Sequence, residues 1–144
     1  MRIVGGRWAD TPLVSPVGRV RPTAEVLREA LMTELGDKLK GTRVLDLFAG
    51  SGALGIEALS RGARYADFVE NHPSALHALK ANIAKIRAGG DARVFKQDAI
   101  VFAERLPAGK YDIAFADPPY GSRKADRAVI AARQDRGHVA AGRG

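Results

Sequence analysis

The feature that most constrains this fold is a regular alternation of short apolar runs with helical segments. Four runs have the length and composition of strands, at residues 44–48, 66–70, 93–96 and 111–116. The segments between them have helical character, at residues 53–60, 73–88 and 100–106. Parallel strands require a crossover, and such crossovers are right-handed. The alternation therefore predicts a three-layer α/β fold with one parallel sheet in the order 3-2-1-4.

A further helix is expected before the alternation, over residues 23–35, with Thr23 as its N-cap. Its apolar face would consist of four residues, Leu27, Ala30, Leu31 and Leu35. The chain then divides into a basic N-terminal arm at residues 1–22, one domain at residues 23–124 and a basic tail at residues 125–144. Within these segments we expect a short strand at residues 2–4 and a helix at residues 125–132. Residues 133–144 carry no strand signal, so we expect a sheet truncated after its fourth strand, which would be an exposed edge.

Composition and charge narrow the function classes. The net charge is +7, and residues 23–120 carry equal numbers of acidic and basic residues, so the whole excess lies at the two ends. Basic ends on a neutral core fit either phosphate binding or simple solubility. There is no cysteine, and the three histidines lack ligand spacing, so we expect no disulfide and no metal. No apolar run is long enough to span a bilayer, and we expect a cytoplasmic monomer.

A glycine-rich motif runs from Asp46 to Gly55, where a strand turns into a helix. Glycines allow close backbone approach to a ligand, and the helix start offers unpaired N–H groups. Glu70 ends the next strand, where its carboxylate could accept hydrogen bonds from a ribose diol. Both nicotinamide cofactors and S-adenosylmethionine carry that diol. A carboxylate at Asp46 disfavours a pyrophosphate and favours the cationic S-adenosylmethionine, unless it merely caps N–H groups of the loop.

A second motif, Asp117-Pro118-Pro119-Tyr120, directly follows the fourth strand. Ligands of open α/β sheets bind outside the carboxyl ends of the strands, so both motifs can share one cleft. An aryl amine is a poor nucleophile because its lone pair is delocalised. If the Asp117 carboxylate and the Pro118 carbonyl accept its hydrogens, the lone pair turns toward the methyl donor, while Tyr120 stacks on the base. A rigid proline turn without chemistry is the alternative.

The site predicted from these motifs has three sets of residues. Asp98, at the end of the third strand, could accept from an adenine amino group, cap the following helix, or do both. The cofactor set is Asp46, Phe48, Ala49, Gly50, Ser51, Gly52, Glu70, Asn71, Asp98 and Ala99. The catalytic set is Asp117, Pro118, Pro119 and Tyr120, and the substrate-binding set is Arg7, Arg19, Arg21, Pro22 and Thr23.

Together these residues resemble a known family. The glycine motif resembles that of class I methyltransferases with a Rossmann-like fold, and Asp-Pro-Pro-Tyr resembles the catalytic motif of amino-methyltransferases acting on bases. Four segments in this order are similar to the bacterial 16S ribosomal RNA guanine-N2 methyltransferases: Arg2-Ile-Val-Gly-Gly-Arg7, Arg21-Pro-Thr23, Arg28-Glu-Ala-Leu31 and Asp46 to Gly55.

The likeness covers residues 1–124 and implies roles for the predicted residues. By this resemblance Glu70 binds the ribose and Asp98 the adenine, while residues 117–120 hold the target guanine. The segment 21–23 would lie beside cofactor and RNA. The substrate implied is ribosomal RNA or an assembling small ribosomal subunit. The family's fold continues with about three more strands.

Three rival functions use some of the same residues. An adenine-N6 DNA methyltransferase would share both motifs. A catalytically inactive module that binds cofactor and RNA would fit a sheet that stops after four strands. A nicotinamide-dependent dehydrogenase explains the glycines and Glu70 but leaves residues 117–120 without a role.

Overall fold

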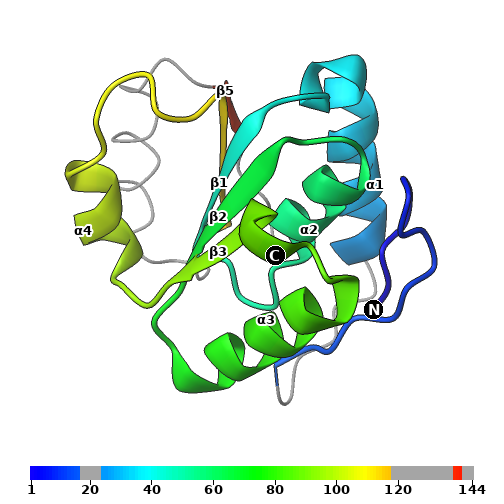
Figure 1. Cartoon of the computed structure of the whole chain (residues 1–144), viewed down its shortest axis with the longest axis horizontal. Coiled ribbons are helices and arrows are strands. Elements are labelled where there is room, and N and C mark those ends of the chain that lie inside the picture. Colours follow the sequence, from blue (N-terminus) through cyan, green and yellow to red (C-terminus); the bar gives the residue numbers. More distant parts are fainter. Residues whose placement is uncertain (17–23, 118–137, 141–144) are drawn as a thin grey trace.

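A computed structural model describes residues 1–16, 24–117 and 138–140 of the chain (Figure 1). Its sheet holds five parallel strands: β1 (Arg43–Leu47), β2 (Tyr65–Val69), β3 (Ala92–Phe95), β4 (Ile113–Ala116) and β5 (His138–Ala140). Its α-helices are α1 (Ala24–Leu35), α2 (Ala53–Ser60), α3 (Pro73–Ile86) and α4 (Ala99–Glu104). Short 3-10 helices, η1 (Gly36–Leu39) and η2 (Gly89–Asp91), follow α1 and α3. The strand order is β3-β2-β1-β4-β5, which confirms the predicted order of the first four strands.

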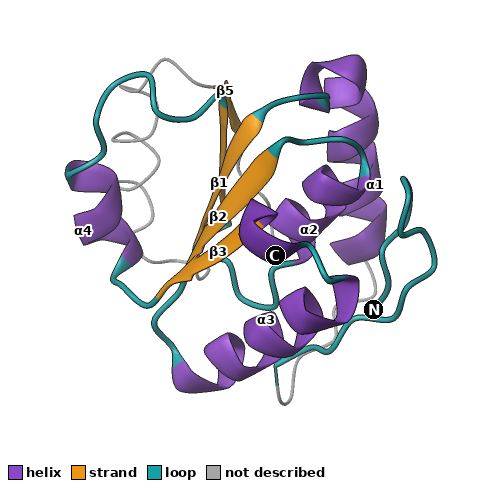
Figure 2. Cartoon of the chain, viewed as in Figure 1, coloured by secondary structure: helices purple, strands orange, loops and turns teal. Residues whose placement is uncertain are grey.

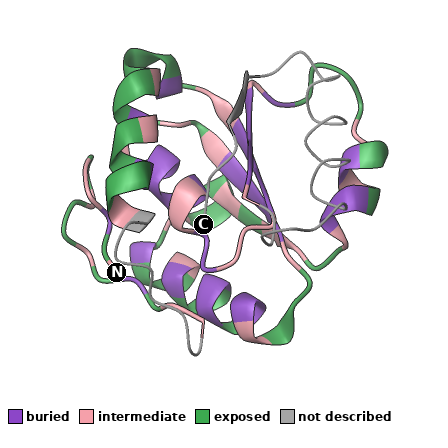
Figure 3. Ribbon diagram, turned by 180° about the vertical axis from the view of Figure 1, so that it is seen from behind, coloured by how far each residue is buried: buried purple, intermediate pink, exposed green. Residues whose placement is uncertain are grey.

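The helices cover the sheet unequally. Helices α1, α2 and α3 lie on one face and α4 on the other (Figures 1 and 2). On the three-helix face, Phe68 of β2 packs with Ile56 and Leu79 in one buried cluster. On the opposite face, Leu45 of β1 packs with Ile100 in a second cluster. Figure 3 shows the buried strands between helices whose outer surfaces are exposed, so both faces of the central strands are buried and mainly apolar, as expected of a parallel sheet.

Strand β5 corrects the expectation that residues 133–144 form no strand. It pairs in parallel with β4, through Ile113 with His138 and Phe115 with Ala140. The fourth strand is therefore not a sheet edge. A strand of three residues is shorter than the four to eight over which side-chain patterning can be recognised. The helix expected at residues 125–132 lies outside the described residues.

Helix α1 begins and ends close to its predicted bounds, but its predicted buried face is only half right. Leu31 and Leu35 pack against the core, whereas Leu27 is 46% exposed and Ala30 is also exposed. In their place the helix buries Arg28, 4% exposed, and Met32, 1% exposed, which the prediction missed because an arginine was expected at the surface. Arg28 is buried because it has an anionic partner inside the protein. The predicted N-cap, Thr23, lies outside the described residues.

That partner is Glu57, in the middle of α2 and fully buried. Its carboxylate accepts backbone N–H groups from Val4 at 2.9 Å and Gly5 at 2.8 Å. It also accepts from Arg28 Nε at 3.1 Å and Arg61 Nε at 2.9 Å. Burial alone would raise the pKa of Glu57, but the Val4 and Gly5 N–H groups and the two arginines lower it overall. One ionised side chain thus joins α1, α2 and the N-terminal arm.

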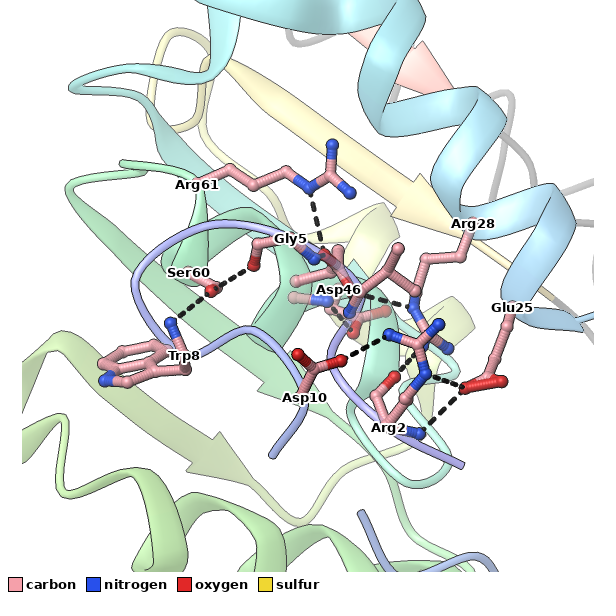
Figure 4. Close-up of polar contacts among 12 residues, drawn as sticks. Arg2, Gly5, Trp8, Asp10, Glu25, Arg28, Asp46, Ser60 and Arg61 are labelled. Atoms are coloured by element: carbon pink, nitrogen blue, oxygen red, sulfur yellow. Dashed lines mark hydrogen bonds and ion pairs between the residues drawn. The ribbon is translucent and has the colours of Figure 1, made fainter. Parts of the chain in front are cut away.

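The tip of the arm packs on the last residue of α2, Ser60 (Figure 4). The Ser60 carbonyl accepts from Arg7 N at 2.9 Å, and its hydroxyl accepts from Trp8 N at 3.0 Å and donates to the Gly5 carbonyl at 2.6 Å. The strand expected at residues 2–4 is reduced to a single antiparallel bridge between Arg2 and Pro12. The described part of the arm, residues 1–16, is therefore fixed both by backbone hydrogen bonds within itself, such as Ile3 N to the Thr11 carbonyl at 2.9 Å, and by contacts to the helices.

Removing the arginine that faces Glu57 should destabilise the fold. Arg28→Ala leaves a fully buried carboxylate short of one cation, a class of change that costs about 3 kcal/mol or more. The matched control is Arg2→Ala, which removes the half-exposed ion pair to Asp10 and should cost less than about 1 kcal/mol. Urea unfolding of both variants measures the difference, and equal free energies of unfolding would contradict the role given to Glu57.

Candidate active site

The register of the sheet brings Phe48, Glu70 and Asp117, the predicted residues that follow three neighbouring strands, together at its carboxyl edge. Leu47 of β1 pairs with Val69 of β2 on one side and with Ala116 of β4 on the other. Glu70 and Asp117, which follow those partners, therefore lie on either side of the start of the glycine loop. Predicted residues from three strands thus share one edge, as the sequence indicated.

The chain leaves β1 in an unusual backbone conformation. Phe48 has φ +56°, in the left-handed region that a bulky residue rarely adopts. This reversal places Ala49 beside β2, where its N–H donates to the Val69 carbonyl at 3.0 Å, and the Ala49 carbonyl accepts from Gly52 at 2.8 Å. Backbone strain of this kind, held by surrounding hydrogen bonds, is typical of binding loops.

The glycines of the loop differ in what they permit. A Cβ on Gly52 would lie 2.5 Å from Leu79 Cδ1, and one on Gly55 would lie 2.4 Å from Phe68 Cε2. These two glycines therefore allow α2 to pack closely on α3 and the sheet. Gly50 has φ +59°, and no described atom would lie within 4 Å of its Cβ. At Gly50 the backbone borders open space, where a ligand can approach it.

Glu70 connects the glycine loop to the start of α3. Its Oε1 accepts from Gly50 N at 2.8 Å, and its Oε2 accepts from Asn71 N at 3.0 Å and His72 N at 2.9 Å. A carboxylate oxygen has two lone pairs, so Oε1 retains one acceptor position beyond its bond to Gly50. The half-buried carboxylate can therefore shape the loop and accept from a ligand hydroxyl simultaneously.

Asp46 is the buried carboxylate of the site, with 1% of its surface exposed. Its Oδ2 accepts from Gly55 N at 3.0 Å. Asp46 thus caps a backbone N–H group of the glycine motif, which was the alternative to a role in cofactor binding. Burial raises the pKa of Asp46 well above its ordinary value, and the Gly55 N–H opposes this. The carboxylates of Asp117 and Glu70 raise it further. Two further carboxylates close enough to act on Asp46 make this edge favourable for a cation and unfavourable for a pyrophosphate.

Asp98 and Ala99 lie at the start of α4, after β3. Asp98 Oδ1 accepts from Ile100 N at 2.9 Å and from Val101 N at 3.1 Å, which is an N-cap. Both bonds use the same oxygen. The capping role anticipated for Asp98 is thus present, and it is compatible with accepting a ligand amine at Oδ2. Ala99 is buried against the sheet.

The remaining predicted residues are not at this edge or are not described. Pro118, Pro119, Tyr120, Arg19, Arg21, Pro22 and Thr23 lie outside the described residues. Arg7 is exposed, with its guanidinium 4.1 Å from the centre of the Trp8 ring, at the Ser60 end of α2. That is the opposite end of the helix from the glycine loop. The structure thus groups Asp46, Gly50, Glu70 and Asp117, and separates Arg7 from them.

Asn82, which was not predicted from the sequence, contacts the predicted cofactor loop. This α3 residue is fully buried. Its Nδ2 donates to the Ser51 carbonyl at 2.9 Å and to the Val14 carbonyl at 2.9 Å, and its Oδ1 accepts from Val14 N at 2.7 Å. The available signal was an amide three residues after Leu79 and four before Ile86, on the apolar stripe of the helix.

Neither a metal site nor a membrane-spanning helix is found among the described residues. Within residues 1–16, 24–117 and 138–140, no cluster of three or more histidine, aspartate or glutamate side chains is placed to hold a metal ion. None of the helices in these ranges has the length and apolar character needed to cross a bilayer.

Comparison with known proteins places this fold in a class. The Escherichia coli protein yhhF superposes with a TM-score of 0.83 at 36% identity, over 97% of this chain and 75% of that one. The Thermus thermophilus 16S rRNA N2 G1207 methyltransferase (RsmC), solved with AdoMet and guanosine, superposes with a TM-score of 0.64 at 28% identity, over 82% of this chain and 33% of that one. The fold is that of the class I methyltransferases.

The family follows from sequence. The model described as Conserved hypothetical protein 95 matches residues 1–140. Ribosomal RNA small subunit methyltransferase D of Escherichia coli is 39% identical over 121 residues, which are 83% of this chain and 60% of that protein. The chain belongs to this family of RNA methyltransferase D-like proteins, as the resemblance indicated, and spans less than two thirds of that relative's length.

The buried carboxylate at Asp46 should cost stability at neutral pH. Because its pKa is raised on folding, the folded protein holds this proton more tightly, and stability falls as pH rises from the unfolded value of 3.8 through the folded pKa. Asp46→Asn keeps an acceptor for Gly55 N and removes the charge. It should raise the free energy of unfolding at pH 7 by about 1 kcal/mol or more.

Denaturant unfolding between about pH 4 and pH 7 tests this. The control, Asp37→Asn, changes a carboxylate that is 96% exposed and should not alter the slope. An Asp46→Asn protein that is less stable than the parent at pH 7 would contradict the assignment.

Proposed function

We propose that this chain transfers a methyl group from S-adenosylmethionine to the exocyclic N2 amine of a guanine in small-subunit ribosomal RNA. The observation that carries the proposal is the meeting of Asp46, Glu70 and Asp117 around a glycine loop at the carboxyl edge of the sheet. Three carboxylates beside open space at Gly50 fit a ligand with two cationic groups and a ribose diol. They do not fit the pyrophosphate of a nicotinamide cofactor.

In this proposal the described residues divide the work of holding the cofactor. Glu70 accepts from the ribose diol through Oε1, and Asp98 accepts from the adenine amine. Asp46 and Asp117 supply negative charge for the sulfonium and ammonium groups. The predicted cofactor residues Phe48, Ala49, Ser51, Gly52, Asn71 and Ala99 supply backbone and packing around them. When bound, the cofactor presents a methyl group on sulfur that is electrophilic.

The chain's own groups would make the guanine amine reactive. Asp117 and the Pro118 carbonyl accept the two amine hydrogens, so the lone pair turns toward the methyl donor. The nitrogen becomes positive as it attacks, and the Asp117 carboxylate stabilises that charge. The two prolines keep the turn rigid, and Tyr120 stacks on the base and holds it in line. After transfer the nitrogen releases one proton to solvent.

The substrate is proposed from charge and from the names of relatives. One relative is named for methylation of small-subunit ribosomal RNA, and one structural neighbour for N2 methylation of a guanosine in 16S RNA. Arg19 and Arg21, with Pro22 and Thr23, would contact RNA at the cleft. Arg7, stacked on Trp8 at the far end of α2, would contact a phosphate farther along the RNA, so the substrate would extend along the arm. We propose a monomer that acts in the cytoplasm, on RNA or on an assembling subunit.

Methyl transfer from radiolabelled S-adenosylmethionine to three substrates tests the function. We expect transfer to small-subunit ribosomal RNA, free or in assembling subunits, and none to duplex DNA. Transfer to adenine in DNA would favour the DNA methyltransferase alternative. Cofactor binding without transfer to any of them would favour an inactive binding module.

The role of Asp117 is tested in the same assay. Asp117→Asn keeps one carbonyl acceptor and loses the charge, a change worth about 2.7–4 kcal/mol for a preorganised group, so the rate should fall by roughly two to three orders of magnitude. The control is Asp112→Asn at the other end of β4, where Arg43 lowers the pKa of the carboxyl to about 2. That variant should keep the parent rate, and a similar fall in both would assign Asp117 to scaffolding.

The cofactor contact of Glu70 is tested by calorimetry. Glu70→Ala should weaken binding of S-adenosylmethionine by about 1–3 kcal/mol, the scale of hydrogen bonds to a charged acceptor. Glu29→Ala, at an exposed position on α1, is the control and should leave the affinity unchanged. NAD titrated into the parent protein should show no binding. Unchanged affinity in a folded Glu70→Ala protein would remove Glu70 from the site.

A further inference from the structure

Asn82 connects two parts of the molecule that have separate roles in the proposed function. The three described hydrogen bonds of its side chain all join it to residues outside its own helix, α3. One reaches the carbonyl of Ser51 in the glycine loop, and two reach the backbone of Val14 in the arm. A single planar amide therefore fixes the position of the cofactor loop relative to the arm.

The geometry of this contact leaves little freedom. Asn82 is fully buried, and an amide offers only two donor hydrogens, both of which are used here. If the Ser51 carbonyl moves, the amide must follow it or leave a buried donor unpaired, which is unfavourable. Moving the amide displaces the hydrogen bonds to Val14. The position of the loop is thus linked to the position of the arm.

A second contact between α3 and the arm lacks this link. Lys85 Nζ donates to the Pro12 carbonyl at 2.8 Å. Its side chain is exposed, and its hydrogen bond holds the arm without contacting the glycine loop. The chain thus contains a natural control, with Asn82 bridging arm and loop and Lys85 binding the arm alone.

The arm leads directly to the proposed RNA-binding residues. In the sequence, Arg19 and Arg21 follow within seven residues of Val14. Leu13 is buried in the same cluster as Leu79 of α3, so the arm is already docked beside Asn82. Val14 is thus the arm residue at which α3 holds the chain shortly before the proposed RNA-binding residues in the sequence.

We propose that Asn82 is a positioning residue that couples cofactor binding to docking of the N-terminal arm. An adenosyl ligand on the glycine loop fixes the Ser51 carbonyl, and the Asn82 amide then holds Val14 more firmly. By linkage, RNA that engages the arm strengthens cofactor binding to the same degree. This inference rests on the proposed function, because it requires the glycine loop to bind an adenosyl ligand.

Hydrogen exchange at the Val14 amide, with and without S-adenosylhomocysteine, tests the coupling. This product analogue occupies the loop without turnover. In the parent protein, saturation should slow exchange at Val14 about fivefold or more, the lower range of typical coupling between sites. In Asn82→Ala the ligand should leave exchange at Val14 unchanged. In Lys85→Ala exchange should be faster overall, yet the ligand should slow it by the same factor as in the parent.

The outcomes separate this inference from the proposed function. If the parent binds S-adenosylhomocysteine but exchange at Val14 does not change, or if Asn82→Ala retains the ligand effect, the inference is wrong and the proposed function stands. If the parent does not bind the ligand, both fall. Should Asn82→Ala not fold, Asn82→Asp replaces it. That variant keeps an acceptor for Val14 N, loses the donors to Ser51 and Val14, and should likewise abolish the ligand effect.

Discussion

The arrangement of the three-helix face depends on one buried carboxylate, that of Glu57. A charge with no exposed surface is stable only when its acceptor positions are filled, and here four donors from three segments fill them. Arg28 also donates to the carbonyl of Arg2, so the arginine and the glutamate both bind the arm. Because these donors come from α1, α2 and the arm, none of the three can shift without leaving a buried charge unpaired. The same helix, α2, begins at the glycine loop, so the anchor of the arm and the proposed cofactor site share one rigid element.

Three buried carboxylates differ in their hydrogen-bond partners, and this difference separates those that stabilise the fold from the one in the proposed site. Glu57 is fully satisfied, and its lowered pKa means that it stabilises the fold above its unfolded pKa and loses this effect as pH falls through the folded value. Asp67 in β2 is equally buried and satisfied, with two hydrogen bonds from Arg93 at 2.9 Å and one from the Tyr111 hydroxyl at 2.6 Å. Among the described residues, Asp46 accepts one hydrogen bond, from Gly55 N, and has like charges nearby; its pKa is raised, whereas that of Glu57 is lowered. A buried carboxylate whose charge destabilises the fold, in a motif whose loop backbone a ligand can approach, is typical of a binding site.

The sequence predicted those features that depend on periodicity and local chemistry. Helix α2 has its predicted bounds and α3 begins where predicted, because the apolar repeat and Pro73 act locally. The buried face of α1, strand β5 and Asn82 could not be predicted in the same way. Each depends on a partner distant in sequence: Glu57 for Arg28, β4 for residues 138–140, and Val14 for Asn82. Asp46 and Asp98 lie between these cases, since their positions were predicted but their contacts within the chain were left as alternatives.

The position of the site follows from the topology rather than from any single residue. From β1 to β3 the chain moves outward on one side, with its connecting helices α2 and α3 on one face. It then crosses to the far side of β1, and α4 lies on the other face. In open α/β sheets the ligand crevice forms at such a reversal of strand order, outside the carboxyl ends of the strands. Asp46 near the end of β1 and Asp117 directly after β4 belong to the two neighbouring strands at this reversal. Because neighbouring parallel strands end together, the charges of Asp117 and Glu70 add to burial in raising the pKa of Asp46, and a cationic ligand or a proton relieves that repulsion.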